Sequence, residues 1–253
     1  MCTIHNIQNA RFVTTRTPDQ RPKIEEYRTQ INNLLTGADN YKRLNNLNWI
    51  RSQLSVEAEC LFQYPDYMPK KEKKQYVDYS NLKNLGTAWD YIVENTNDVI
   101  DNFAIKEIHK ILCVDSDIPG GLYRLSDAYI EQLGVHAPAY AQLLYRMDDI
   151  QYRLQNESMP IVSRAINAHF DIIASQPFND FNKRTARLVM NWFLIQNGYQ
   201  PILFNRKTDK VDYMAALRSR AHNDCRRYSA YMYAAMQRTQ KDILALLKKA
   251  RVL

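Results

Sequence analysis

The stretch of sequence that decides the fold is residues 169–187, which read His-Phe-Asp-Ile-Ile-Ala-Ser-Gln-Pro-Phe-Asn-Asp-Phe-Asn-Lys-Arg-Thr-Ala-Arg. Apolar residues recur at helical spacing over 161–174 and again over 183–197, and the Pro-Phe segment interrupts them. The pattern predicts two helices joined by a short loop, the second closed by Gly198 at its C-terminus. The loop therefore ends at a helix N-terminus, where unpaired N–H groups and the helix dipole favour an anion.

Three charged side chains at this loop suggest a chemistry. Arg184 and Arg187 are three residues apart, so both project from one side of the first helical turns. Asp180 lies just upstream, and its carboxylate can hold a divalent cation. Together they make a polyphosphate–Mg²⁺ site chemically reasonable. Taken singly, these residues have simpler interpretations: Asp180 as an N-cap residue, and the two arginines as part of a solvated helix face.

Working outward, helical periodicity covers most of the chain. Two helices are expected between Lys23 and Phe62, with a break at 36–39, followed by a Pro-rich turn at 64–69. Further helices are expected over 70–95, 104–114, 143–155, 210–223 and 227–251. Residues 123–140 are rich in Tyr, Ile and Val and are interrupted by Gly134 and Pro138, which predicts a short hairpin or flap. The expected fold class is mostly α with one small β element.

The composition excludes several classes of protein. A chain of 253 residues with 45% hydrophobic and 24% charged content suits one soluble domain. The four cysteines lie more than fifty residues apart, so no pair has metal-site or redox-motif spacing; we expect a reducing compartment and a cytoplasmic location. With six glycines and neither G-x-G-x-x-G nor a P-loop motif, a dinucleotide fold or P-loop ATPase is excluded. No apolar run is long enough for a membrane span, and residues 1–22 lack a signal-peptide core.

The charge balance favours an anionic partner without naming it. Thirty-four Lys and Arg face twenty-seven Asp and Glu, a net charge of +7, but apart from runs at 70–74 and 248–251 the positive residues are dispersed. A nucleic-acid-binding helical protein is suggested only by this charge and by seventeen tyrosines. It ranks lowest because no nucleic-acid motif appears, so no nucleic-acid partner is expected.

The order of residues 176–187 resembles the signature of the Fic/Doc (Fido) family, His-Pro-Phe-x-Asp/Glu-Gly-Asn-Gly-Arg-x-x-Arg. The matching positions are Pro177, Phe178, Asp180, Asn182, Arg184 and Arg187. The Asn-Lys-Arg order is similar to the Doc branch, in which Lys replaces the second Gly. Gly121-Leu-Tyr-Arg124 resembles the family's Gly-x-Tyr-Arg turn ahead of its target-docking flap. The resemblance covers roughly residues 45–223 and implies a Fic-like helical bundle with one β-hairpin flap.

Family members typically transfer AMP from ATP onto a hydroxyl of a target protein. The resemblance therefore implies ATP and Mg²⁺ as cofactors, and a nucleotide and a protein target as partners. It implies a Mg²⁺ ligand at Asp180, an α-phosphate contact at Asn182, and nucleotide contacts at Lys183, Arg184 and Arg187. The flap, with Tyr129, Ile130, Val135 and His136, would take the target backbone as an added strand.

The chain departs from the family signature at three positions. Gln176 stands where the family has its general base, a histidine, and a carboxamide can orient a hydroxyl but cannot take its proton. Losing such a base costs about 10²–10⁴-fold in rate. Phe181 and Lys183 replace two glycines; Phe181 is expected to obstruct the close approach of a phosphate, and Lys183 adds a charge. His169 is seven residues before Gln176, too far to replace the base, and is expected in the core.

A second resemblance lies on an N-terminal helix. Ser55-Val-Glu57 resembles the inhibitory Ser-x-Ile-Glu-Gly segment ahead of many Fic cores, although Gln53 and Ala58 depart from it. It implies that Glu57 pairs with Arg187 and excludes the γ-phosphate. An ordinary surface glutamate is the alternative.

These observations predict a bacterial-type Fic protein that binds nucleotide and has weak or absent AMP transfer, a pseudoenzyme in the extreme case. A Doc-like phosphotransferase, favoured by Lys183, and a non-catalytic protein-docking module are the alternatives, and a homodimer is left open. The expected organisation is a polar arm over 1–22, N-terminal helices with the inhibitory segment over 23–66, a Fic-like core over 67–223 and a C-terminal helix over 224–253.

Overall fold

The computed structural model describes residues 20–36, 40–46, 48–61, 82–156 and 158–250, and its fold is mostly α-helical with one two-stranded hairpin, as predicted. The helices are α1 (Arg21–Leu35), α2 (Asn40–Asn46), α3 (Trp49–Leu61), α5 (Leu82–Glu94), α6 (Asn102–Leu112), α7 (Leu143–Asn156), α8 (Ile161–Ser175), α9 (Asn182–Gln196), α10 (Asp209–Ala221) and α11 (Cys225–Ala250), and a 3₁₀ turn, η3, spans Tyr140–Gln142. Residues 1–19, the turn at 64–69 and the first half of the helix expected over 70–95 lie outside the described residues. Among the described helices, none combines the length and apolar character that crossing a membrane requires.

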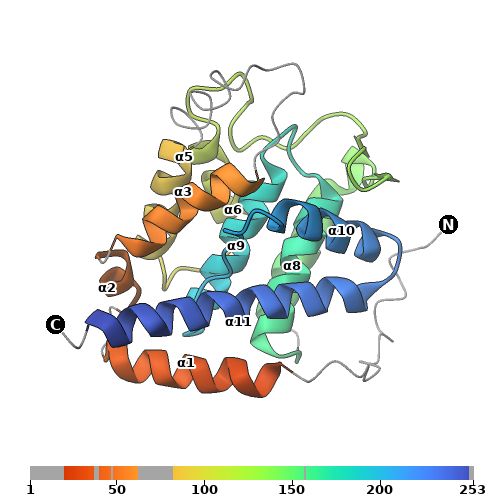
Figure 1. Ribbon diagram of the computed structural model, residues 1–253. Coiled ribbons are helices and arrows are strands. Elements are labelled where there is room, and N and C mark those ends of the chain that lie inside the picture. Colours follow the sequence, from red (N-terminus) through yellow and green to blue (C-terminus); the bar gives the residue numbers. More distant parts are fainter. Residues whose placement is uncertain (1–19, 37–39, 47, 62–81, 157, 251–253) are drawn as a thin grey trace.

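Helix α9 is the centre of the bundle. Its residues from Thr185 to Ile195 are all buried, which is the pattern of a helix surrounded on every side. It pairs most extensively with α8 and is also contacted by α5 and α6 (Figure 1). On the outer side, α11 runs alongside both α1 and α10. Because the loop quoted at the outset joins α8 to α9, it sits at one end of the central helix pair.

The prediction of two helices before Phe62 is wrong, because the segment forms three. Helix α1 ends at Leu35 and α2 begins at Asn40, on either side of the expected break, but α2 and α3 are also separate helices. Asn48, just before α3, has a positive φ of 55°, a left-handed conformation that interrupts a helix and that asparagine tolerates better than most residues. The apolar spacing continues across this break, so the hydrophobic pattern alone does not reveal it.

The β element is a short antiparallel hairpin between α6 and α7. Strand β1 (Tyr129–Ile130) pairs with β2 (Val135–His136), with Tyr129 opposite His136 and Ile130 opposite Val135. The turn closes where the N–H of Gly134 donates to the carbonyl of Ile130 at 2.9 Å, with Gly134 at a φ of 70°. Ile130 is buried and anchors the hairpin to the core, whereas Tyr129 and His136 are exposed.

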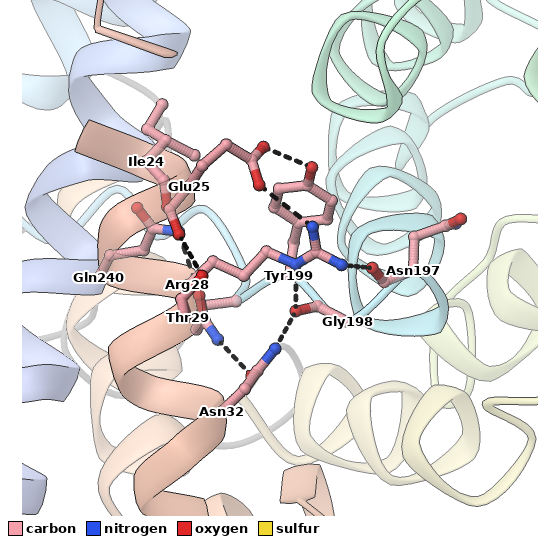
Figure 2. Close-up of polar contacts among 10 residues, drawn as sticks. Ile24, Glu25, Arg28, Thr29, Asn32, Asn197, Gly198, Tyr199 and Gln240 are labelled. Carbon is pink, nitrogen blue, oxygen red and sulfur yellow. Dashed lines mark hydrogen bonds and ion pairs between the residues drawn. The ribbon is translucent and has the colours of Figure 1, made fainter. Parts of the chain in front are cut away.

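The C-terminus of α9 is tied to α1. Gly198, at a φ of 74°, donates its N–H to Ile195, and Tyr199 donates to Leu194, which is the Schellman arrangement that the glycine predicts. Figure 2 shows Arg28 of α1 reaching this turn, where its guanidinium donates to the carbonyls of Gly198 and Asn197 at 3.2 and 3.1 Å. Helix α1 thus satisfies carbonyls that the end of α9 leaves unpaired.

Two further contacts complete this junction. Arg28 lies 4.1 Å above the ring of Tyr199, whose hydroxyl donates to Glu25 at 2.6 Å (Figure 2). The side chain of Asn32 donates to the carbonyl of Gly198 at 3.0 Å, and Gln240 of α11 donates to the carbonyl of Ile24 at 3.2 Å. Helix α1 is therefore held by directional polar contacts as well as by its buried apolar residues.

We expect Arg28→Ala to lower the free energy of unfolding by about 1–3 kcal/mol, because it leaves two carbonyls at the end of α9 without their charged donor. Urea denaturation followed by circular dichroism measures the change. Lys23→Ala, at an exposed position of the same helix, is the matched control and should cost less than 0.5 kcal/mol, the usual limit at such surface positions. Equal losses in the two variants would contradict a specific role for Arg28.

Candidate functional site

The loop between α8 and α9 turns at Gln176, the residue that caps α8. Its backbone is left-handed, with φ 44° and ψ 56°, and its N–H donates to the carbonyl of Ile172 at 3.1 Å. Such a conformation is strained for a residue other than glycine and persists only where the surroundings hold it. The side chain of Gln176 is half-buried.

Asn182, the first residue of α9, closes the loop on itself. Its side-chain oxygen accepts from the N–H of Phe178 at 2.9 Å, and its side-chain nitrogen donates to the carbonyl of Phe178 at 2.8 Å. Phe178 is fully buried, so this pair of bonds is shielded from water and anchors the loop in the core. The amide of Asn182 is thus used to hold the loop against the core.

The residues just before α9 differ from two expectations. The N-cap residue is Phe181 rather than Asp180, which makes the N-cap alternative for Asp180 wrong. Asp180 is exposed, and its carboxylate accepts from the N–H of Phe181 at 2.6 Å. The ring of Phe181 is only 8% exposed and lies under the guanidinium of Arg184, at 3.8 Å from its centroid. It therefore packs into the core, where a ring obstructing the approach of a phosphate was expected, and a phenylalanine cannot cap the helix with its side chain.

His109 of α6 packs against the loop, a role that the sequence did not predict. Its ring stacks on Phe178 with centroids 3.7 Å apart and an interplanar angle of 6°. Nδ1 accepts from the N–H of Gly121 at 2.9 Å, so Nε2 carries the proton and donates to the carbonyl of Asp180 at 3.2 Å. Burial lowers the pKa of His109 to about 4, so the ring is neutral at pH 7. Its position on the buried face of an amphipathic helix was the only available signal.

Arg124, from the Gly-x-Tyr-Arg turn, joins the loop to the flap. Its side chain donates to the carbonyl of Gln176 at 2.7 Å and to that of Ser175 at 3.3 Å, at the end of α8. It also donates to the carbonyls of Ser126 and Pro138, on either side of the hairpin. Arg124 as a whole residue is only 3% exposed. One buried side chain therefore fixes the base of the flap relative to the turn at Gln176.

The tip of the flap is held from the opposite side. The ammonium of Lys183 contacts the side chain of Gln132, and Arg218 of α10 donates to the carbonyl of Gln132 at 2.8 Å. His222 lies 3.1 Å from the carbonyl of Leu133. Burial, with a further contribution from Arg187, lowers the pKa of Lys183 to about 8. Lys183 is thus a buried cation with a further positive charge nearby, an environment that a bound anion would stabilise.

Arg187 and Glu57 are brought together, although 130 residues separate them. Nε of Arg187 donates to one carboxylate oxygen of Glu57 at 2.6 Å, and the N–H of Phe204 donates to the other at 3.0 Å. Both side chains are buried, with 8% and 3% of each exposed. Removing one partner of such a pair leaves an uncompensated buried charge, so the contact holds α3 firmly against α9.

His169 is fully buried, as predicted, and belongs to a polar network inside the bundle. Its Nε2 lies 2.8 Å from the hydroxyl of Tyr213, and its Nδ1 lies 2.7 Å from that of Tyr228. Tyr213 is in turn a neighbour of Arg187, whose positive charge acts against the rise that burial causes in the pKa of Tyr213. Tyr213 and Tyr228 were missed by the sequence analysis, because nothing in their local pattern distinguishes them from other core tyrosines.

Around the start of α9 the structure assembles the residues that the sequence singles out for a nucleotide. Lys183 and Arg184 flank the helix start, and Asp180 precedes it. In the part of the chain that the structure describes, no group of three or more His, Cys, Asp or Glu forms a ready-made metal site. Asp180 therefore stands as a single exposed carboxylate beside a positively charged helix N-terminus.

The family model and the similar curated proteins that match this chain all carry the name Fic. Residues 99–194 match the family model described as Fic/DOC family. The chain is 29% identical over 174 residues to the protein adenylyltransferase Fic of Aedes aegypti, which covers 66% of this chain and 34% of that protein. It is 30% identical over 132 residues to the protein adenylyltransferase fic-1 of Caenorhabditis briggsae, covering 51% of this chain and 25% of that one. The chain thus spans about a third or less of the length of these relatives.

Solved structures support the fold. Residues 134–508 of Fic-1 from C. elegans superpose with a TM-score of 0.67 at 19% identity, covering 91% of this chain and 73% of that one. A Fic-domain-containing signalling protein from Bacteroides thetaiotaomicron gives a TM-score of 0.66 at 19% identity, covering 90% of this chain and 97% of that one. The bundle with its hairpin is therefore an arrangement that solved Fic proteins share.

The neutral state of His109 makes stability depend on pH. Because the pKa of His109 is about 4 in the folded protein, against about 6.5 in an unfolded chain, the unfolded state takes up a proton first as the pH falls. The stabilisation is complete above pH 6.5 and is lost as the pH falls from 6.5 towards 4. We expect His109→Gln to be less stable than the wild type at pH 7, with the difference shrinking by pH 4.5. Urea denaturation at both pH values measures it, with the exposed His136→Gln as control; a constant difference would contradict the assignment.

Proposed function

We propose that this chain, whose residues 99–194 match the family model described as Fic/DOC family, is a nucleotide-binding protein of the adenylyltransferase type in which AMP transfer to a protein hydroxyl is weakened or lost. The observation that carries the proposal is Gln176. It stands at the position of the family's base, at the head of a loop whose other supports are in place. The protein retains the features expected for holding a nucleotide and lacks the side chain that would move the proton.

The start of α9 is the seat that we propose for the phosphates. A helix N-terminus without a capping side chain presents N–H donors to an anion, and Lys183 and Arg184 add positive charge there. The exposed carboxylate of Asp180 fits Mg²⁺, which usually takes one or two carboxylates together with substrate phosphates. When bound, Mg²⁺ supplies neutralisation of the phosphate charge. Asn182 would act from its backbone, since its side chain holds Phe178.

Gln176 limits what this site can do with a bound nucleotide. The attacking hydroxyl must lose its proton as it bonds to the α-phosphorus and displaces pyrophosphate, and a carboxamide has no basic lone pair to receive that proton near neutral pH. The side chain of Gln176 can still orient the hydroxyl by hydrogen bonding. We therefore assign Gln176 an orienting role and attribute the weakened transfer to it.

Glu57 is proposed to be the inhibitory residue. By resemblance, Arg187 would hold the outer phosphates of ATP, and its Nε is committed to the Glu57 carboxylate at 2.6 Å. A carboxylate and a γ-phosphate cannot both lie against one guanidinium, because two like charges would be buried together. Release of Glu57 also breaks its bond with the N–H of Phe204, so displacing α3 requires the loss of two buried contacts.

The hairpin is proposed to receive the protein target. A short exposed strand pair can add the backbone of an extended peptide as a further strand. Tyr129 and His136 present exposed side chains at the same register position, while Ile130 and Val135 attach the hairpin to the core. Arg124 and Lys183 fix the two ends of the flap, so a peptide docked there would lie next to Gln176.

We also propose a cytoplasmic setting. The four cysteines of the sequence lie more than fifty residues apart, which suits a reducing compartment.

We expect Glu57→Gly to bind ATP–Mg²⁺ at least tenfold more tightly than the wild type, because it frees Arg187 for the outer phosphates. Isothermal titration calorimetry measures both affinities. Glu94→Gly, at an exposed position near the end of α5, is the matched control and should bind as the wild type does. Unchanged affinity in Glu57→Gly would remove Glu57 from the inhibitory role.

We expect Gln176→His, placed in the Glu57→Gly background, to raise label transfer from α-³²P-ATP by about 10²–10⁴-fold, the usual contribution of a general base. Arg184→Ala in the same background is the inactive control. Parallel reactions with γ-³²P-ATP separate AMP transfer from the Doc-like phosphoryl transfer that Lys183 suggests. Strong α-labelling with Gln176 still present would overturn the proposal of weakened catalysis, and no labelling by either nucleotide in the His variant would favour a docking module.

A further inference from the structure

We propose that Tyr213 and His169 are positioning residues that hold the Arg187 guanidinium ready for a phosphate after Glu57 has moved away. The inference rests on the proposed function and extends it to two side chains outside the family signature. It is carried by a chain of buried hydrogen bonds whose direction follows from the chemistry of each member. The chain begins at Tyr213 on α10, a neighbour of Arg187, and runs through His169 on α8 to Tyr228 on α11.

The direction of the hydrogen bonds is fixed at Tyr228, the end of the chain that lies farthest from Arg187. The hydroxyl of Tyr228 donates its only proton to the carbonyl of Ile166 at 2.7 Å. Its oxygen can therefore only accept from Nδ1 of His169, which lies 2.7 Å away. This places the proton of the imidazole on Nδ1.

The direction then passes to Arg187. His169 is fully buried beside the charges of Arg187 and Arg220, and burial together with those charges keeps the ring neutral by lowering its pKa well below 6.5. Its Nε2 therefore carries a lone pair and accepts the proton of the Tyr213 hydroxyl at 2.8 Å. The oxygen of Tyr213 therefore keeps its lone pairs for Arg187, a neighbouring side chain that has donors only. The protons of Tyr228, His169 and Tyr213 each have one acceptor.

Arg187 is consequently held from two independent sides. Glu57 comes from α3, which the protein would have to move to admit a nucleotide. Tyr213 comes from α10, and its partners on α8 and α11 are equally buried in the bundle that surrounds α9. The guanidinium also donates to the carbonyl of Lys183, one turn back on its own helix, at 3.4 Å. Loss of Glu57 therefore leaves the guanidinium oriented by contacts that do not move with α3.

A guanidinium that stays oriented costs less to engage than one that must be ordered on binding. Because Arg187 is assigned to the outer phosphates, its orientation matters for ATP and not for AMP, which has only the α-phosphate. A purely structural role of the chain would instead affect both nucleotides equally. This difference gives the test its readout.

The experiment compares Tyr213→Phe with Tyr233→Phe, both in the Glu57→Gly background. Tyr233 is the matched control: it is a buried tyrosine whose hydroxyl lies 2.9 Å from Ser163, on a different polar contact. Calorimetric titration with ATP–Mg²⁺ and with AMP should give about tenfold weaker ATP binding for Tyr213→Phe, with AMP binding unchanged. Tyr233→Phe should change neither. Equal ATP affinity in the two variants, or parallel losses for ATP and AMP, would overturn the inference.

A second measurement does not depend on nucleotide binding. Nitrogen-15 NMR should find His169 as the neutral Nδ1–H tautomer, and rotation of the Arg187 guanidinium should remain slow in Glu57→Gly but become fast when Tyr213→Phe is added. An Nε2–H tautomer, or equally fast rotation in both variants, would overturn the inference. If Glu57→Gly bound no ATP while the NMR results held, the proposed function would fail and the positioning of Arg187 would stand.

Discussion

A guanidinium buried at the centre of a helical bundle is the constraint on which this structure depends. Arg187 lies on a helix that is surrounded on all sides, so its charge cannot be satisfied by water. Uncompensated, a buried ion costs several kcal/mol, which is a large part of the stability of a domain. The compensation comes from α3, from α10 and from the backbone of α9 itself. The need to neutralise one side chain therefore brings together helices that are distant in the sequence.

A second constraint acts on the loop before α9, where two residues have a strained, left-handed backbone conformation. Gln176 and Phe181 both have positive φ where neither is glycine. Asn182 holds the loop from within, His109 holds the carbonyl of Asp180, and Arg124 holds the carbonyl of Gln176. Phe181 stands where the family has glycine, and the burial of its ring between Arg184 and His109 offsets the conformational cost.

The parts of this arrangement that the sequence predicts are those encoded locally. The helix–loop–helix at 161–197, its closure at Gly198 and the hairpin near Gly134 follow from periodicity and turn residues, and the structure agrees. The separation of α2 from α3 was not predicted, because the apolar spacing continues through Asn48.

The sequence did not predict the roles of His109 and Tyr213, for a different reason. Each acts through a partner tens of residues away, and a single histidine or tyrosine on a buried helix face carries no local mark of its partner. The contact between Glu57 and Arg187 was anticipated only through resemblance to a family, since 130 residues of chain separate them. Local pattern thus predicts elements, whereas the network that joins them appears only once the helices are packed.

The two chemical tasks of the proposed site, proton removal and phosphate binding, depend on different kinds of interaction. In the proposed function, proton removal depends on one side chain, at position 176, so a substitution there weakens transfer without disturbing the backbone that Arg124 holds. The proposed phosphate binding depends instead on a helix terminus, two nearby cations and a buried arginine that the surrounding helices support. Removing that arginine's partners would leave a buried charge uncompensated, so the bundle's own stability preserves the geometry of the phosphate seat. The residues proposed to bind nucleotide therefore have a physical reason to persist without a base at position 176, because their interactions also hold the fold together.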